Sequence, residues 1–274
     1  MPNQVSYQTI YSTQIYLNSS SSMLMNSTAK SNVHFYIQNA INSSKKNTIE
    51  MRVSLVNAQF PCSFYQINNN NNTININDID YVFPNGNYNV NNFISTWYNV
   101  VGNTWLLTFS AITNKLIFNN NTTTFVFTDS PQNSLFPVIG FTPGNTYSCN
   151  FTTMTAPYCV NFSGLSRLLI SSPTFSLNSK TSYDSAMSNI IASVPNNCIQ
   201  NGIIYYTNYT NYKSIFKNSE LSCITIQIQD DNENFVDFNN LDWSLTLQVD
   251  QVHEVIDNLD SVDDIYETAK SELL

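Results

Sequence analysis

Apolar and polar residues alternate with a period of two along several stretches of this chain, which is the pattern of β-strands with one buried face. The pattern is clearest at 49–55, 224–229 and 243–249. Further strands are predicted at 33–38, 73–83, 104–110, 114–118, 123–128, 165–171, 189–194 and 202–207. Segments rich in Pro, Asn and Gly separate many of them and predict turns. Many short strands joined by turns indicate an all-β sandwich or barrel.

Two segments have helical spacing instead. Asn89 is a suitable N-cap for a helix that places Phe93 and Trp97 on one face and ends at Gly102. Residues 250–274 repeat apolar side chains three to four positions apart with acidic residues between them, and so predict an acidic C-terminal helix. The apolar face of that helix packs either on its own domain or on another subunit, and the sequence leaves both open.

The chain carries 19 acidic against 10 basic residues in 274, and only 11% of its residues are charged. Eight of the acidic residues and one lysine lie in 250–274, so residues 1–249 are nearly neutral. Neither part has the basic stripe that nucleic-acid binding needs, which excludes that class of partner. No apolar run reaches the length of a membrane span, and residues 1–22 show no signal-peptide pattern.

Asparagine takes the place of the missing charges and outnumbers all charged residues together. An uncharged polar surface suits a protein packed against many neighbours, because contact then requires little desolvation of ions. An AT-rich genome would produce the same excess of asparagine without any functional meaning.

No catalytic, cofactor-binding or metal-binding residues are predicted. The two histidines have no second metal ligand at a useful spacing; His34 fits a strand face and His253 the tail helix. The five cysteines form no CxxC pair and are expected to be reduced thiols. The acidic cluster 230–234 lacks the Gly and Glu of a calcium loop and is expected to be a hairpin turn between strands 224–229 and 243–249.

These elements suggest one principal domain. We expect an N-terminal arm with the first strand at 1–47, a single jelly-roll β-sandwich at 48–249, and the acidic helix or tail at 250–274. Eight strands and their connections need on the order of 150–180 residues, so the segment 48–249 is longer than a jelly roll requires. The elaborated middle segment, 103–160, is expected to be an insertion or knob.

Four stretches of the chain resemble the penton, or minor capsid, proteins of virophages and Polinton-like viruses, which belong to the double-jelly-roll capsid lineage. The stretches are the strand and loop at 53–68, the turn at 83–88 with the helix that ends near Trp97, the strands at 168–172 and 188–195, and the block 226–230 with 236–247. The last block looks like the closing hairpin of the family. Together the stretches span 48–98 and 162–249, over half of the chain.

The resemblance implies a structural protein of the virion that is not an enzyme and needs no cofactor. It implies a homopentamer at the five-fold vertices of an icosahedral capsid, in contact with a double-jelly-roll major capsid protein and assembled in the host cytoplasm. Minor or cement capsid proteins are expected as further partners of the C-terminal tail.

Other functions stay open on the sequence. A β-sandwich that binds carbohydrate or a receptor needs exposed aromatic side chains, and Trp97, Trp105 and Tyr158 are the candidates for such a sugar platform. Composition also does not distinguish a vertex protein from a minor capsid protein that cements the shell away from the vertices, so this alternative stays open. A hydrolase on this scaffold needs convergent carboxylates, which only the segment 230–237 offers.

Overall fold

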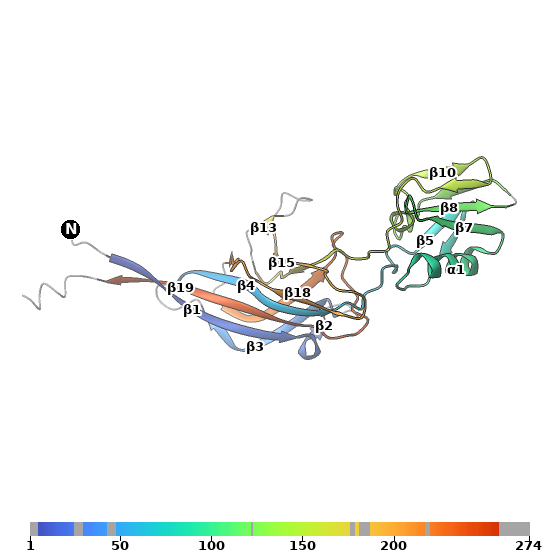
Figure 1. Ribbon diagram of the computed structural model, residues 1–274. Helices are drawn as coiled ribbons and strands as arrows, with labels where there is room; N and C mark the ends of the chain where they lie inside the picture. Colours follow the sequence, from blue (N-terminus) through green and yellow to red (C-terminus); the bar gives the residue numbers. More distant parts are fainter. Residues whose placement is uncertain are drawn as a thin grey trace, which may run out of the picture. The chain divides into compact units, whose positions relative to one another are not determined.

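The computed structural model describes residues 5–24, 30–42, 48–121, 123–175, 179–180, 187–216 and 220–257. The chain divides into two compact units. One consists of Met1–Phe64 with Arg167–Leu274, and the other of Tyr65–Ser166. Figure 1 shows that β-strands dominate both units.

The first unit is an eight-stranded jelly roll made of two antiparallel sheets (Figure 1). Its main strands are β1 (Val5–Asn18), β3 (Asn32–Asn42), β4 (Thr48–Pro61), β12 (Arg167–Ser171), β15 (Ile190–Pro195), β16 (Ile203–Thr207), β18 (Glu220–Gln229) and β19 (Ser244–Asp257). Sheet A has the order β1-β19-β4-β16, and sheet B has the order β15-β12-β18-β3. Consecutive main strands alternate between the sheets, except that β12 and β15 share sheet B. This is the connectivity of a jelly roll, so the expected all-β fold is confirmed.

Short elements complete the jelly-roll unit. They are the 3-10 helix η1 (Ser19–Ser21), β2 (Met23–Leu24), β13 (Ser179–Lys180), β14 (Met187–Ser188) and β17 (Ser214–Phe216). Strand β2 pairs with β3, and β17 pairs with β4 on the same side as β16.

Aromatic rings from both sheets close the core of the jelly roll. Phe60 of β4 stacks on Phe238 with a centroid distance of 6.0 Å, and it lies 6.0 Å from the ring of Trp243. Phe35 of β3, in the opposite sheet, lies 6.1 Å from the same indole. All four rings are buried. The period-two alternation of β3 and β4 places Phe35 and Phe60 inside, because successive side chains of a strand point to opposite faces, whereas Phe238 and Trp243 lie in the segment before β19.

The second unit is inserted between β4 and β12 of the jelly roll. Its strands are β5 (Thr73–Ile76), β6 (Ile79–Val82), β7 (Trp105–Ser110), β8 (Lys115–Asn120), β9 (Phe125–Thr128), β10 (Thr146–Cys149) and β11 (Thr153–Thr155), and its helices are α1 (Val90–Val101) and α2 (Phe136–Ile139). The strands form two sheets, β10-β9-β5-β6 and β11-β8-β7. Trp97 lies at the centre of a separate buried core, 5.0 Å from Phe118 and 5.7 Å from Trp105 between ring centroids.

Helix α1 follows the sequence prediction closely. The side chain of Asn89 accepts a hydrogen bond from the amide of Asn92, and the Asn92 side chain accepts one from the amide of Asn89, which completes a capping box. Gly102 ends the helix with a φ of 113°, a conformation that favours glycine. Phe93 and Trp97 are the buried residues of the helix.

Replacing Asn89 with Ala should lower the free energy of unfolding of the inserted unit by about 1 kcal/mol, because the amide of Asn92 at the start of α1 loses its acceptor. Chemical denaturation followed by tryptophan fluorescence measures this loss. Asn91→Ala is the matched control, since Asn91 is exposed within the same helix and does not cap it. An equal loss of stability in both variants would contradict the assigned role of Asn89.

The domain boundaries differ from those expected from the sequence. The segment 1–47, expected to be an arm with one strand, contributes β1 and β3, which belong to different sheets of the jelly roll. The segment 48–249 holds two units, because the chain leaves the jelly roll after residue 64 and returns at 167. The inserted unit contains the segment 103–160 but begins earlier, since β5 and α1 bury apolar side chains in its core and Tyr81 of β6 packs against it.

The expected C-terminal helix is not found in the described part of the tail. Strand β19 continues to Asp257 and pairs with β1 from Asn18↔Ser244 to Val5↔Asp257. The register against β4 shifts between Val252 and His253, and both residues are buried. This irregularity places two buried residues in succession and so interrupts the period-two alternation of the strand. Residues 258–274 lie outside the described residues.

Two turns also differ from the sequence prediction. The stretch 73–83 is a hairpin rather than one strand, because Asn77 and Asp78 both have positive φ and join β5 to β6. The strands before and after the acidic cluster 230–234 do not form a hairpin with each other, since β18 lies in sheet B and β19 in sheet A. Asn239 and Asn240 both have positive φ and form a turn before β19.

Candidate functional site

One edge of sheet A is long, regularly paired and uncharged. Strand β1 pairs with β19 over 14 residues without a register shift, and within the described residues no strand pairs with its other side. Its sequence contains no charged residue, proline or glycine. Natural edge strands are usually protected by charges, proline or bulges against pairing with another chain. We call residues 5–18 the β1 edge; at about 3.3 Å per residue it is roughly 45 Å long.

The side chains of the β1 edge are suited to contact with another protein. Tyr16 is 75% exposed, and its hydroxyl donates a hydrogen bond to Gln14 Oε1 at 2.7 Å. Ile10 and Tyr11 are about half exposed, and the ring of Tyr11 packs edge-on against His253. Tyrosine is enriched in the cores of protein interfaces, whereas the charged residues missing from this edge are depleted there.

The opposite edge of sheet A has the same character. Residues 203–216, called the β16–β17 edge, contain both strands that pair with the far side of β4. Lys213 is the single charged residue in this stretch. Its exposed apolar and aromatic side chains are Ile203, Tyr205, Tyr209, Tyr212 and Ile215. Sheet A therefore ends on both sides in a surface rich in tyrosine and isoleucine, with Lys213 as the single charged residue of the two stretches.

A hydrogen-bonded ion pair joins the elements that carry the two edges. Asp250 of β19 is 1% exposed; it accepts hydrogen bonds from Ser12 of β1 at 2.6 Å and from Gln248 at 2.8 Å, and it pairs with Lys213 at 2.5 Å. Arg52 lies beside Asp250 in the register but pairs with Glu50. Burial alone would raise the pKa of Asp250, but the hydrogen bonds from Lys213, Ser12 and Gln248 outweigh it and lower this pKa below its ordinary value of 3.8.

The ion pair makes the stability of the jelly roll depend on pH. Because the pKa of Asp250 is lower in the folded state, its contribution is fully present above the ordinary value of 3.8 and is lost as the pH falls through the folded pKa. Asp250→Asn should lower the free energy of unfolding by about 2 kcal/mol near neutral pH. Urea denaturation of both proteins at neutral pH and at about pH 3 should show this difference shrinking in acid. A difference that stays constant would contradict the assignment.

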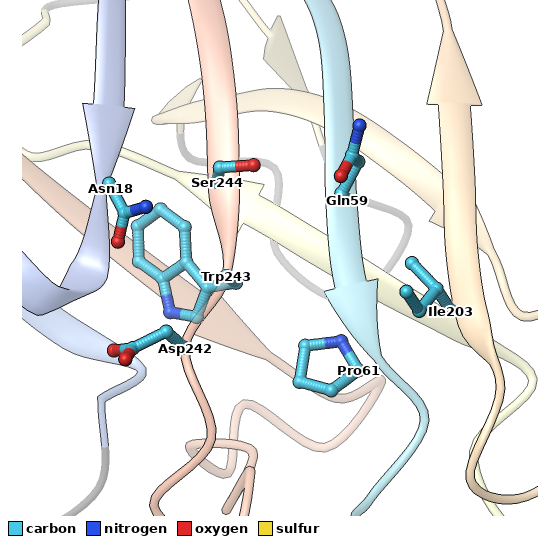
Figure 2. A pocket seen from close by; sticks show the side chains of 7 residues that line it. All are labelled: Asn18, Gln59, Pro61, Ile203, Asp242, Trp243 and Ser244. Carbon is cyan, nitrogen blue, oxygen red and sulfur yellow. The ribbon is translucent and has the colours of Figure 1, made fainter.

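A shallow hollow lies at one end of sheet A. It has a volume of about 140 Å³ and is lined by Asn18, Gln59, Pro61, Ile203, Asp242, Trp243 and Ser244. Figure 2 shows these side chains on and beside β1, β19, β4 and β16, which are neighbours in this order in sheet A. Hydrogen bonds from Lys30 at 2.7 Å and from Ser19 at 2.8 Å lower the pKa of Asp242. Its carboxylate is thus paired with the charge of Lys30.

The sugar platform proposed from the sequence is not assembled. Trp97 and Trp105 are buried in the core of the inserted unit, whereas Tyr158 is 61% exposed. The two indoles therefore cannot stack on a ligand at the surface. This hypothesis was wrong because sequence alone does not distinguish a buried aromatic residue from an exposed one.

The acidic cluster and the histidines have structural roles. The carboxylate of Asp230 accepts hydrogen bonds from the amides of Asn232 and Asn234, which closes a tight loop, and Asp231 pairs with Arg167. His34 lies on β3 beside the hydroxyl of Thr225, as expected of a strand face. His253 lies on β19 and not on a helix.

Neither a metal-binding cluster nor a membrane-spanning helix is found where the chain is described. In the ranges given above, no three His, Cys, Asp or Glu side chains are placed to hold a metal ion together. No helix among these residues is both long and apolar enough to cross a membrane.

Sequence reasoning missed the β1 edge. Thr9, Tyr11, Thr13, Ile15 and Leu17 alternate with mostly polar residues, but only Leu17 is buried. The signal was a period of two carried by β-branched and aromatic residues instead of strongly apolar ones.

Comparison with known proteins gives structural matches at low sequence identity. No protein-family model matches the sequence, and no curated protein matches it. Among solved structures, the chain is similar to the mavirus penton protein, with 11% identity and a TM-score of 0.41 over 86% of this chain and 99% of that one. It is also similar to a chain of the Sputnik virophage structure, with 11% identity and a TM-score of 0.40 over 91% of this chain and 98% of that one.

Proposed function

We propose that this protein is a structural capsid protein that acts through subunit contacts and not through catalysis. The observation that carries the proposal is the pair of unprotected edges on one sheet of a jelly roll. Jelly rolls of this kind build viral capsids and lectins, and an edge of 14 residues without a charge is a hazard unless another chain covers it. The sequence resemblance to virophage penton proteins supports the same assignment.

The two edges suggest how copies join. The β1 edge of one copy meets the β16–β17 edge of the next, which is a head-to-tail contact between two different surfaces. Such a contact closes into a ring when the rotation between copies permits, and five copies form the ring that fits a five-fold vertex. Each contact needs to bury on the order of 1,000 Å² or more, and an edge roughly 45 Å long offers that area.

Subunits of the major capsid protein surround the ring. In this proposal the pentamer fills the five-fold vertex of an icosahedral virion and contacts neighbouring double-jelly-roll subunits, after assembly in the host cytoplasm. The hollow at Trp243 is a site where a side chain of either neighbour fits.

Cryo-electron microscopy of virions that contain this protein tests its place in the shell. The jelly roll should occupy density on the five-fold axes, in five copies around each axis. Density only on the faces of the shell would replace the vertex role with that of a cement protein. Absence of the protein from purified virions would contradict a capsid role altogether.

A further inference from the structure

Two cysteines that are far apart in the sequence converge in the jelly roll. Cys62 directly follows β4, and Cys198 lies in the loop between β15 and β16. Both thiols donate a hydrogen bond to the same oxygen, Oδ1 of Asn196, with sulfur–oxygen distances of 3.8 Å. Each sulfur is therefore held beside a shared acceptor.

The backbone fixes the loop against Cys62. The amide of Cys62 donates to the carbonyl of Gly202, and the amide of Asn201 donates to the carbonyl of Cys62, both at 2.9 Å. A Cβ atom added to Gly202 would lie 3.5 Å from Cβ and from Sγ of Cys198. Cys198 therefore packs on the glycine that is hydrogen-bonded to Cys62, and two opposed backbone hydrogen bonds hold this arrangement.

The two thiols differ in their access to solvent. Cys62 is buried, and burial, followed by its contact with Cys198, raises its pKa to about 11. Cys198 is only partly buried. A small molecule in solution thus reaches Cys198 first, while Cys62 is placed to react afterwards.

We propose that Cys62 and Cys198 are a thiol pair that a small-molecule disulfide such as glutathione disulfide converts into an intramolecular cross-link. The thiolate of Cys198 attacks one sulfur of the disulfide, forms a mixed disulfide and releases one molecule of the small thiol. The thiolate of Cys62 then attacks Sγ of Cys198, which forms the cross-link and releases the second molecule of the small thiol. The two protons lost by the cysteines end on the two released thiols, so the protein is oxidised by two electrons and the small disulfide is reduced.

The cross-link fastens the chain where it leaves the jelly roll for the inserted unit. It joins the end of β4 in sheet A to the loop that connects sheet B with β16. A reducing cytosol keeps the pair as thiols, whereas an oxidising medium outside a cell closes it. The site therefore provides a cross-link that forms after release from the host cell.

Incubation of the reduced full-length protein with glutathione disulfide tests the proposal. Peptide mapping should find Cys62 joined to Cys198, and dithiothreitol should reverse the link. The melting temperature should rise by roughly 5 °C or more on closure, since the link restricts the unfolded chain across the whole inserted unit. Closure should also accelerate about tenfold per pH unit below the pKa of Cys62, because the second step needs its thiolate.

Single variants separate the two steps. In Cys62→Ser, Cys198 should retain one glutathione, and in Cys198→Ser, buried Cys62 should stay a thiol. Cys223→Ser is the matched control and should cross-link like the natural protein, because Cys223 lies on β18 and takes no part in the pair. Wild-type protein that carries glutathione on Cys198 while Cys62 remains a thiol, even at alkaline pH, would overturn the proposal. So would a link that joins either cysteine to another copy of the chain.

Discussion

The double substitution Gln14→Lys with Tyr16→Lys should leave the jelly roll folded and keep the protein monomeric. Both side chains are exposed on the β1 edge, where Tyr16 donates its hydroxyl hydrogen to Gln14. In a ring these positions face the next copy, and each lysine forced into that contact costs roughly 2 kcal/mol of desolvation. Two lysines thus weaken each contact about a thousandfold, enough to abolish the pentamer in sedimentation velocity.

The matched control places the same charges on the inserted unit. Phe151→Lys with Tyr158→Lys replaces two exposed aromatic residues that belong to the inserted unit and to neither edge of sheet A. This variant should assemble like the natural protein. Loss of the pentamer in the control alone would show that copies join through the inserted unit and not through the jelly roll.

Mixing two edge variants distinguishes a head-to-tail contact from a symmetric one. Ile203→Lys with Tyr205→Lys disables the β16–β17 edge and should also give a monomer. A mixture of this variant with the β1-edge variant still contains one intact edge of each kind, so it should form a dimer of one copy of each and nothing larger. If the β1 edge paired with itself, the β16–β17 variant would assemble normally, and the proposed contact would be wrong.

Phe60→Ala should lower the free energy of unfolding of the jelly roll by about 3–5 kcal/mol and leave the inserted unit folded. Phe60 is fully buried and touches both Phe238 and Trp243, so its removal opens a cavity at the centre of this core. A loss of that size is a large part of the 5–15 kcal/mol that stabilises an ordinary domain.

The counterpart in the inserted unit is Phe118→Ala, because Phe118 is fully buried against Trp97 and Phe127. Differential scanning calorimetry should show two transitions, with Phe60→Ala lowering one melting temperature and Phe118→Ala the other. If each variant lowered both transitions equally, the two cores would not be independent units.

Local patterns in the sequence predicted the elements whose stability is local. Helix α1 is an example, since Asn89 caps it and Gly102 ends it within one continuous segment. The alternation in β4 likewise identified its buried face. Residues that depend on distant partners were harder to predict: β1 is polar enough to resemble an arm, and it becomes a strand because β19, more than 200 residues later, pairs with it.

The candidate site depends on such distant pairings. Alternation in β18 and β19 shows which side chains face inward but not which sheet each strand joins, so the two strands were expected to pair and instead lie in opposite sheets. The convergence of Cys62 with Cys198 follows from the same long-range topology. Edges are a property of the assembled sheet, and no short sequence pattern marks them.

Native mass spectrometry of the purified full-length protein tests the central claim most directly, which is that copies join through the two edges of sheet A into a closed ring. The account predicts one dominant species of five times the chain mass of 31.1 kDa, and this species should disappear in the β1-edge variant. A protein that stays monomeric as its concentration is raised, or a pentamer that persists with lysines at Gln14 and Tyr16, would contradict it.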